Sequence, residues 1–222
     1  MVSSCVAHAM STILEYHAKG RNKLSTNFIY GIRKKLFGSE GKGMYLRDAC
    51  KIVTQYGDML EEDCPGNIEV PMVYGVAEKA LEDEEAVKYA ADYKVKAYFT
   101  CKTEEDVKTA LIQYGPVLAS LKWFNDFKVK NGILCGGDGK ATGYHAIVVY
   151  GYNEDGFLCQ NSWGKSWGNG GCFILPYDIK FAETRGLIDL ENDEYVSPKK
   201  INKILNKILK LVNTIINLFL KR

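Results

Sequence analysis

The fold class is decided by residues 161–171, which read NSWGKSWGNGG. Four of these eleven residues are glycine, a composition typical of turns rather than of regular secondary structure. Short runs of apolar, β-branched and aromatic residues lie around this stretch, at residues 117–121, 146–150, 156–159 and 172–175. Because such runs between glycine turns are typical of strands, we predict a C-terminal part that is rich in β-structure.

The N-terminal part has a different pattern, in which apolar residues recur at helical spacing. Helices are predicted at residues 5–17, 45–56, 76–89 and 104–114. The first follows Ser4, which suits a helix N-cap, and the last is stopped by Gly115 and Pro116. Helices followed by strands predict an α+β protein, with one helical lobe, one β lobe and a cleft between them.

The composition is that of an ordinary soluble globular protein, with 46% hydrophobic and 25% charged residues. The formal net charge is +2, but seven basic residues and no acidic residue follow Glu194, so the preceding part is net acidic. This acidic part gives no electrostatic reason to expect nucleic-acid binding.

The seven cysteines are widely spaced and include no CxxC pair. We therefore expect no metal site and no cofactor. The odd number of cysteines fits one functional thiol together with either free cysteines or up to three disulfides, and the sequence does not distinguish between the two.

Residues 196–222 are predicted to form a basic amphipathic helix that begins at Ser197 and Pro198. We expect this helix to pack on its own domain or on a second copy, with docking to another protein or to an anionic membrane surface as the alternatives. The chain shows no recognisable signal peptide and no apolar run long enough to span a bilayer, and its localisation stays unknown.

Cys5 is a candidate nucleophile, because a cysteine in the first turn of a helix lies at the positive end of the helix dipole. A thiol nucleophile needs a base, and the chain has three histidines. His8 and His17 fall within the first predicted helix and are interpreted as structural. His145 opens the predicted strand at residues 146–150, so its imidazole is expected at the edge of a lobe, facing the cleft.

Here the sequence resembles that of a known family. NSWGKSWGNGG resembles the Asn-Ser-Trp-Gly signature of papain-like cysteine peptidases (family C1), HAIVVYGYN resembles the segment at their catalytic histidine, and SCVAHA resembles the segment at their nucleophile. GPVLASL and NGIL resemble the segments that precede the histidine. The motifs occur in the order of the family, with His145 and Asn161 140 and 156 residues after Cys5. The resemblance covers residues 1–195. The abundance of Lys, Asn and Ile in the composition indicates a bacterial or viral type.

The resemblance implies a papain-like two-lobe fold with the active site in the cleft. The helical lobe would comprise residues 1–115, and an antiparallel, β-barrel-like lobe would comprise residues 116–195, followed by the helix at 196–222. By the same resemblance Cys5 is the nucleophile, His145 is the general base and acid, and Asn161 orients the imidazole.

Three further residues are expected at the site. Trp163 would cover the Asn–His hydrogen bond from water, although an isolated tryptophan would be read as core packing. Gly43 resembles the glycine that pairs with an extended substrate, with an ordinary loop glycine as the alternative. Tyr144 precedes the histidine where Asp or Asn is common, so the polarity of the cleft is expected to differ there.

The implied function is a cysteine endopeptidase that hydrolyses polypeptides through a thioester, including the protein from which it was cut. The alternatives are an inactive papain-like interaction module and a thiol amidase that acts on cell-wall peptides. The family's oxyanion-hole glutamine would fall two residues upstream of Met1, and its loss predicts an activity lower by roughly 10²–10³-fold. A fragment, a misplaced start codon and a weak enzyme are the explanations considered, and we favour the fragment. Val6 replaces the usual tryptophan after the nucleophile, which changes packing more than chemistry.

Overall fold

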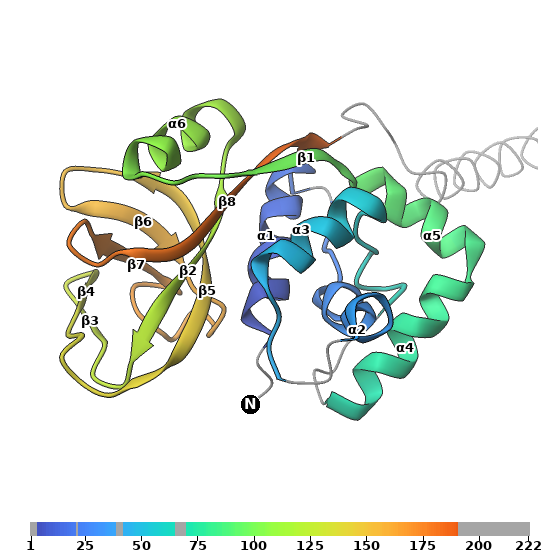
Figure 1. Cartoon of the computed structure of the whole chain (residues 1–222), viewed down its shortest axis with the longest axis horizontal. Coiled ribbons are helices and arrows are strands. Elements are labelled where there is room, and N and C mark those ends of the chain that lie inside the picture. The colour runs from blue at the N-terminus through green and yellow to red at the C-terminus, as the bar shows by residue number, and fades with distance from the viewer. Residues whose placement is uncertain (1–3, 21, 39–41, 65–69, 191–222) are drawn as a thin grey trace, which may run out of the picture. The chain divides into compact units, whose positions relative to one another are not determined.

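The computed structural model describes residues 4–20, 22–38, 42–64 and 70–190, so the predicted helix at residues 196–222 lies outside the described residues. Figure 1 shows the described chain as two lobes. The helical lobe consists of α1 (Cys5–His17), α2 (Thr26–Phe37), α3 (Leu46–Gln55), α4 (Val70–Glu82), α5 (Glu84–Ala90) and the short 3-10 helix η1 (Ala91–Tyr93). The β lobe is built on a sheet that is accompanied by one helix, α6 (Glu104–Tyr114).

The sheet has eight strands in the order β1-β8-β2-β5-β6-β7-β4-β3. These strands are β1 (Val95–Thr100), β2 (Val117–Phe124), β3 (Lys128–Lys130), β4 (Ile133–Cys135), β5 (Ala141–Tyr152), β6 (Gly156–Gln160), β7 (Cys172–Pro176) and β8 (Phe181–Leu190). Neighbouring strands are antiparallel except β4 and β7, which form one parallel bridge. The order of helices first and strands afterwards confirms the predicted α+β architecture with two lobes.

Strand β5 lies between two apolar cores and contributes side chains to both. Ala146 and Val148 belong to the core of the helical lobe, whereas Ile147 and Val149 belong to the core of the β lobe. This division follows from strand geometry, because successive side chains point to opposite faces. The helical core is completed by apolar faces of α1, α2 and α3, and the β core by residues of β2, β6, β7 and α6. The predicted lobe boundary at residue 115 stays a prediction, although the buried side chains of α6 lie in the β core.

The predicted helices at Cys5–His17 and Glu104–Tyr114 are confirmed, and the one at residues 45–56 corresponds to α3. The prediction of a single helix at residues 76–89 is wrong. The chain leaves helical geometry at Asp83, whose carboxylate accepts hydrogen bonds from the N–H groups of Glu85 and Ala86 and so starts a new helix.

Helix α2 was not predicted, although its sequence contains the signals. Ser25 is its N-cap and accepts a hydrogen bond from the N–H of Phe28 at 3.0 Å, and Gly38 ends it in the left-handed conformation. Strands β1, β3, β4 and β8 were not predicted either. β3 and β4 have only three residues each, which is too short for a periodic pattern.

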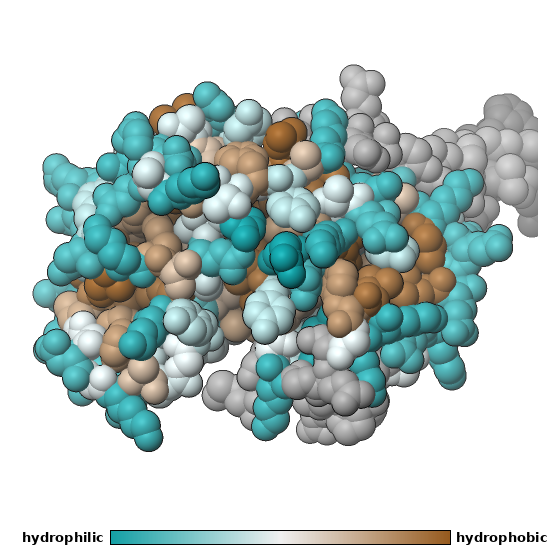
Figure 2. All heavy atoms as spheres, viewed as in Figure 1, coloured by the Kyte–Doolittle hydropathy of each residue, from teal (hydrophilic) through white to brown (hydrophobic). Residues whose placement is uncertain are grey.

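Hydrophilic side chains cover much of the visible face of both lobes, with smaller apolar areas between them (Figure 2). Among the described residues, no helix has the length and the apolar character needed to span a bilayer.

Candidate functional site

Cys5 is the first residue of α1, so the path of the backbone at the start of this helix sets the position of the thiol. The preceding residue, Ser4, is the N-cap but forms no side-chain capping bond, and the first turn contains no acidic residue. The positive end of the helix dipole and the first N–H groups of α1 therefore act on the Cys5 thiol without competition from a capping carboxylate. The helix start thus acts in favour of the thiolate, whereas burial of the side chain acts against it.

His145 and Asn161 are joined by a hydrogen bond of 2.7 Å between Nε2 and Oδ1. The same Asn161 oxygen accepts a second hydrogen bond, at 2.8 Å, from the N–H of Ser162. Because that N–H can only donate, the atom between them must be the amide oxygen and Nε2 must carry a proton. In the neutral imidazole the remaining nitrogen, Nδ1, is then free to accept a proton.

The glycine-rich turn at residues 161–171 determines the position of Asn161. Asn161 directly follows β6, and its own N–H donates to the carbonyl oxygen of Gly171 at 2.9 Å. His145 lies on β5, which pairs with β6 in the sheet. Two adjacent strands thus present the imidazole and the amide to each other, although 16 residues separate them in the chain.

Trp163 lies against the imidazole of His145, with ring centroids 4.7 Å apart and the planes inclined by 32°. Its side chain is 38% exposed, whereas His145 is 8% exposed and Asn161 6%. The indole therefore lies between the His–Asn pair and the solvent. A second tryptophan, Trp123 on β2, contacts the same imidazole edge to face at 5.0 Å.

Cys5 and His145 both line a cavity of about 770 Å³ at the boundary of the lobes. The cavity is lined by five parts of the chain, namely the start of α1, residues 42–46, Ser120, residues 142–146 and residues 182–183. Gly43 and Tyr144 are among the lining residues, and Asn161 and Trp163 are not. The structure thus brings four of the six predicted site residues to one cavity and holds the other two against His145.

Gly43 has a φ of +94°, a conformation that favours glycine, and its carbonyl oxygen accepts a hydrogen bond from Nε of Arg33 at 2.9 Å. Tyr144 is 72% exposed, and Tyr45, which lines the same cavity, is 71% exposed. These two aromatic side chains stand at the rim of the cavity, one from each lobe, where they are free to contact a ligand.

Burial raises the pKa of the Cys5 thiol, and backbone hydrogen bonds with Ala146 and Val6 lower it in part. Burial also lowers the pKa of His145, while the hydrogen bond to Asn161 raises it. Each charge alone is thus disfavoured in the cavity. A single proton transfer from thiol to imidazole forms both charges together, and these attract each other without creating net charge.

The sequence analysis missed the contribution of β8 to this cavity. Ala182 and Glu183 line it, and the carboxylate of Glu183 forms an ion pair with the guanidinium of Arg185. Arg185 also donates to the hydroxyl oxygen of Thr100 at 2.8 Å. Residues 181–187 read FAETRGL and show no alternation of apolar and polar residues, so no local pattern indicated this strand or the cavity that it borders.

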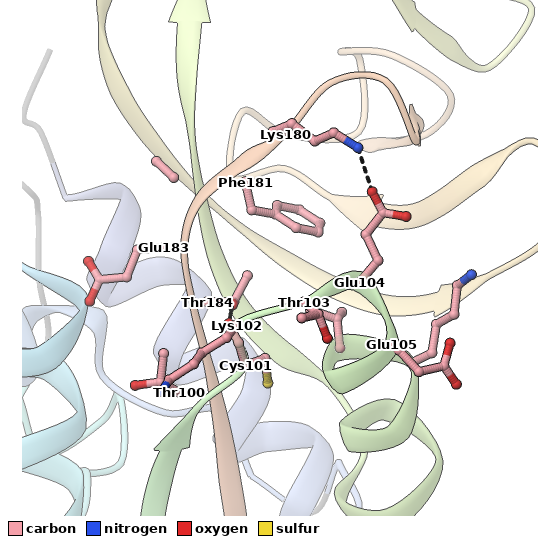
Figure 3. Close-up of a pocket in the computed structure, with 13 residues that line it drawn as sticks. Thr100, Cys101, Lys102, Thr103, Glu104, Glu105, Lys180, Phe181, Glu183 and Thr184 are labelled. Atoms are coloured by element: carbon pink, nitrogen blue, oxygen red, sulfur yellow. Dashed lines mark hydrogen bonds and ion pairs between the residues drawn. The ribbon is translucent and has the colours of Figure 1, made fainter.

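A second cavity, of about 800 Å³, lies between β8 and the start of α6 (Figure 3). Its lining carries both signs of charge, and an ion pair of 2.6 Å between Lys180 and Glu104 joins its two sides. Ala182 and Glu183 border both cavities, but none of the predicted site residues lines this second one.

All seven cysteines lie in the described part of the chain, and each carries a free thiol. The described residues contain no cluster of three or more histidine, cysteine or acidic side chains that could hold a metal ion.

The model of the family "Papain family cysteine protease" matches residues 3–188. An uncharacterized peptidase C1-like protein of Acanthamoeba polyphaga mimivirus is 28% identical over 225 residues, which cover 92% of this chain and 70% of that protein. Cathepsin B-like cysteine proteinase 1 of Haemonchus contortus is 34% identical over 110 residues, or 45% of this chain. That match spans only 32% of the length of the Haemonchus protein.

Among solved structures, the chain is similar to xylellain, a cysteine protease from Xylella fastidiosa. The TM-score is 0.71 at 20% sequence identity, covering 86% of this chain and 81% of xylellain. This similarity shows a papain-like fold, and the family model extends over most of the chain, from the segment at Cys5 to β8. The chain therefore belongs to the papain family of cysteine proteases.

Proposed function

We propose that this chain is a cysteine peptidase that hydrolyses peptide bonds, with Cys5 as nucleophile, His145 as general base and acid, and Asn161 as the residue that orients the imidazole. The observation that carries this proposal is the 2.7 Å hydrogen bond between His145 and Asn161, beside a cavity that also exposes Cys5. Asn161 leaves only Nδ1 of the neutral imidazole free to take the thiol proton, as a base for Cys5 requires.

The reaction would begin when the Cys5 thiol gives its proton to Nδ1 of His145. The thiolate then adds to the carbonyl carbon of the scissile amide, and the carbonyl electrons move to oxygen to form a tetrahedral oxyanion. When this intermediate collapses, the C–N bond breaks and the imidazolium protonates the leaving amine, which leaves a thioester on Cys5. Water, deprotonated by His145, hydrolyses the thioester and restores the thiol.

The oxyanion needs hydrogen-bond donors at the start of α1. The N–H of Cys5 has no partner within the helix, because the first N–H groups of a helix precede its hydrogen-bond ladder. We assign this N–H as one donor, and the dipole of α1 as a further source of stabilisation. A second donor from a segment upstream of Ser4 would raise the rate.

An extended polypeptide is the substrate that the cavity suits best. Residues 42–46 present backbone from the helical lobe and residues 142–146 present backbone from the β lobe, so a peptide between them can pair with both. The exposed rings of Tyr45 and Tyr144 provide apolar surface on either side of it.

Labelling of the full chain with a thiol-directed activity-based probe tests this proposal. We expect the probe to modify Cys5, with labelling lost in Cys5→Ala and reduced at least tenfold in His145→Ala. Cys135→Ser is the matched control, because Cys135 is also a partly exposed free thiol but lies on β4. Peptide hydrolysis should be lost in both site variants and unchanged in the control.

The outcomes separate the proposal from its alternatives. Absence of labelling, also after a Gln-Gly extension upstream of Met1, would indicate a papain-like module without turnover. Labelling with hydrolysis of cell-wall peptides, but not of unfolded polypeptides, would indicate a thiol amidase. Appearance of fragments of the chain itself in the wild type, but not in Cys5→Ala, would support self-processing.

A further inference from the structure

Trp123 occupies the centre of an aromatic cluster in the β lobe. Its ring contacts His145, Trp163, Trp167, Phe127 and Phe173, with centroid distances between 5.0 and 6.5 Å. Trp123 is 9% exposed, so it lies beneath Trp163 rather than at the surface. None of the sequence motifs identified this residue.

The register of the sheet explains why Trp123 reaches His145. On β2 and β5, Trp123 is opposite Gly143 and Leu121 is opposite His145, so Trp123 and His145 are diagonal neighbours on one face. An aromatic side chain can bridge this diagonal spacing in an antiparallel pair. A Cβ built at Gly143 would meet nothing within 4 Å, so the indole does not cover the glycine.

The two tryptophans hold the imidazole from different directions. Trp163 lies nearly parallel to the His145 ring, at 32°, whereas the Trp123 ring stands at 74° to it. The two indoles also contact each other at 5.0 Å and 78°. Rotation of the imidazole about its own side-chain bonds would therefore displace one indole or the other, and would break the hydrogen bond to Asn161.

A hydrogen bond ties Trp123 to the strand that carries His145. The hydroxyl group of Thr142 donates to the carbonyl oxygen of Trp123 at 3.1 Å, and the register of the sheet shifts directly after Trp123. The backbone of Trp123 is thus held at the end of the regular pairing between β2 and β5. This arrangement keeps the indole at the same place relative to His145.

We propose that Trp123 is a positioning residue for the proposed reaction, whose indole fixes the plane of the His145 imidazole and excludes water from it. The role rests on the proposed function, because it acts through the general base. It differs from that of Trp163, which covers the His–Asn pair from the solvent side. Removing the Trp123 ring should leave Trp163 in place but free to tilt.

The test compares Trp123→Leu with the wild-type chain by NMR titration of the three histidines, with the His145 resonance identified by its absence in His145→Asn. Without the indole, water should reach the imidazole, so we expect the midpoint of the His145 titration to move upward. The midpoint of His8, in the helical lobe, should not move. The rate of Cys5 alkylation by iodoacetamide, and kcat/KM for a peptide substrate, should fall about tenfold.

Phe173→Leu is the matched control. Phe173 is also buried and contacts Trp123 and Trp167, but not His145, in the described cluster. This substitution should destabilise the lobe while leaving the His145 titration and the Cys5 alkylation rate of the folded protein unchanged. Trp123→Phe keeps a ring at the same place, and we expect it to restore both rates to within about threefold of the wild type.

The proposal is overturned if Trp123→Leu and Phe173→Leu lower stability alike and neither moves the His145 midpoint or the alkylation rate. If Trp123→Leu does not fold, Trp123→Met takes its place with the same expected results. Failure of the proposed function is a separate outcome. If the wild-type chain cleaves no peptide, the His145 titration and the Cys5 alkylation rate still test the role of Trp123, because neither measurement requires peptide cleavage.

Discussion

In the helical lobe Cys5 is held by the backbone of α1, without a side-chain capping bond, whereas in the β lobe His145 is held by other side chains. Asn161, Trp163 and Trp123 surround the imidazole on separate sides. A helix start needs only the correct backbone path, but an imidazole on a strand can rotate unless its neighbours prevent it. The two halves of the candidate site should therefore respond differently to substitution.

Substitutions in the helical lobe away from Cys5 should change stability with little effect on the chemistry of folded molecules. Substitutions around His145 should change the chemistry with a smaller effect on stability.

Gly57→Ala should have the largest effect, on stability in the helical lobe. Gly57 has a φ of +83°, and a Cβ there would lie 1.8 Å from the carbonyl oxygen of Ala90. We expect the free energy of unfolding, measured with urea, to fall by about 3 kcal/mol or more. Activity per folded molecule should be unchanged.

Gly20→Ala is the control for this prediction. Gly20 also has a positive φ, of +63°, but a Cβ there would meet nothing within 4 Å. Gly20→Ala should lower the free energy of unfolding by only about 1 kcal/mol, because only the backbone conformation is strained. Equal costs at the two glycines would show that the close approach to Ala90 relaxes easily.

Asn161→Ala should lower kcat/KM about 100-fold, because the imidazole loses the partner that selects its orientation. Loss of this hydrogen bond should also lower the pKa of His145 further, since the bond raises it. Asn153→Ala is the matched control in the same lobe, where the Asn153 side chain accepts two backbone hydrogen bonds in a turn. Similar activity losses in both variants would show that the loss does not come from the contact between Asn161 and His145.

Thr103→Ala should destabilise the protein by about 1 kcal/mol without altering activity. Thr103 and Asp106 form a capping box at the start of α6. Asp83→Ala removes a comparable cap from α5 in the other lobe and should lower the free energy of unfolding by a similar amount. An activity loss in Thr103→Ala would instead connect α6, and the cavity it borders, with the site.

Asp58, in the helical lobe, is expected to make the stability of the protein depend gradually on pH. Its carboxyl group is fully buried, with the Ser11 hydroxyl and the Met59 N–H as hydrogen-bond partners, and burial raises its pKa well above 3.8. The folded state keeps a proton that the unfolded state releases, so the stability contributed by Asp58 is present at low pH and is lost as the pH rises.

Asp58→Asn removes this titration. The free energy of unfolding of the wild type, relative to that of Asp58→Asn, should fall as the pH rises from about 4 through the folded-state pKa. Urea unfolding of both proteins at several pH values gives this difference. A difference that grows with pH would mean that Asp58 is ionised and stabilised in the folded state.

The sequence by itself determined the fold class, the family resemblance and the residue types of the site. Local patterns were sufficient for α1, α6 and the glycine turn at residues 161–171, because capping, helical spacing and turn chemistry act between close neighbours in the chain. The break at Asp83 is also a local signal, and it was overlooked because the charged residues on either side continue a helical pattern.

Only the tertiary structure decided that Trp123 contacts His145 and that Glu183 lines the cavity. Trp123 becomes its neighbour through the register of β2 on β5, and Glu183 reaches the cavity because β8 lies beside β2. These contacts join residues more than twenty positions apart. Their formation depends on strand pairing and on the packing of two cores, which no short window of sequence specifies.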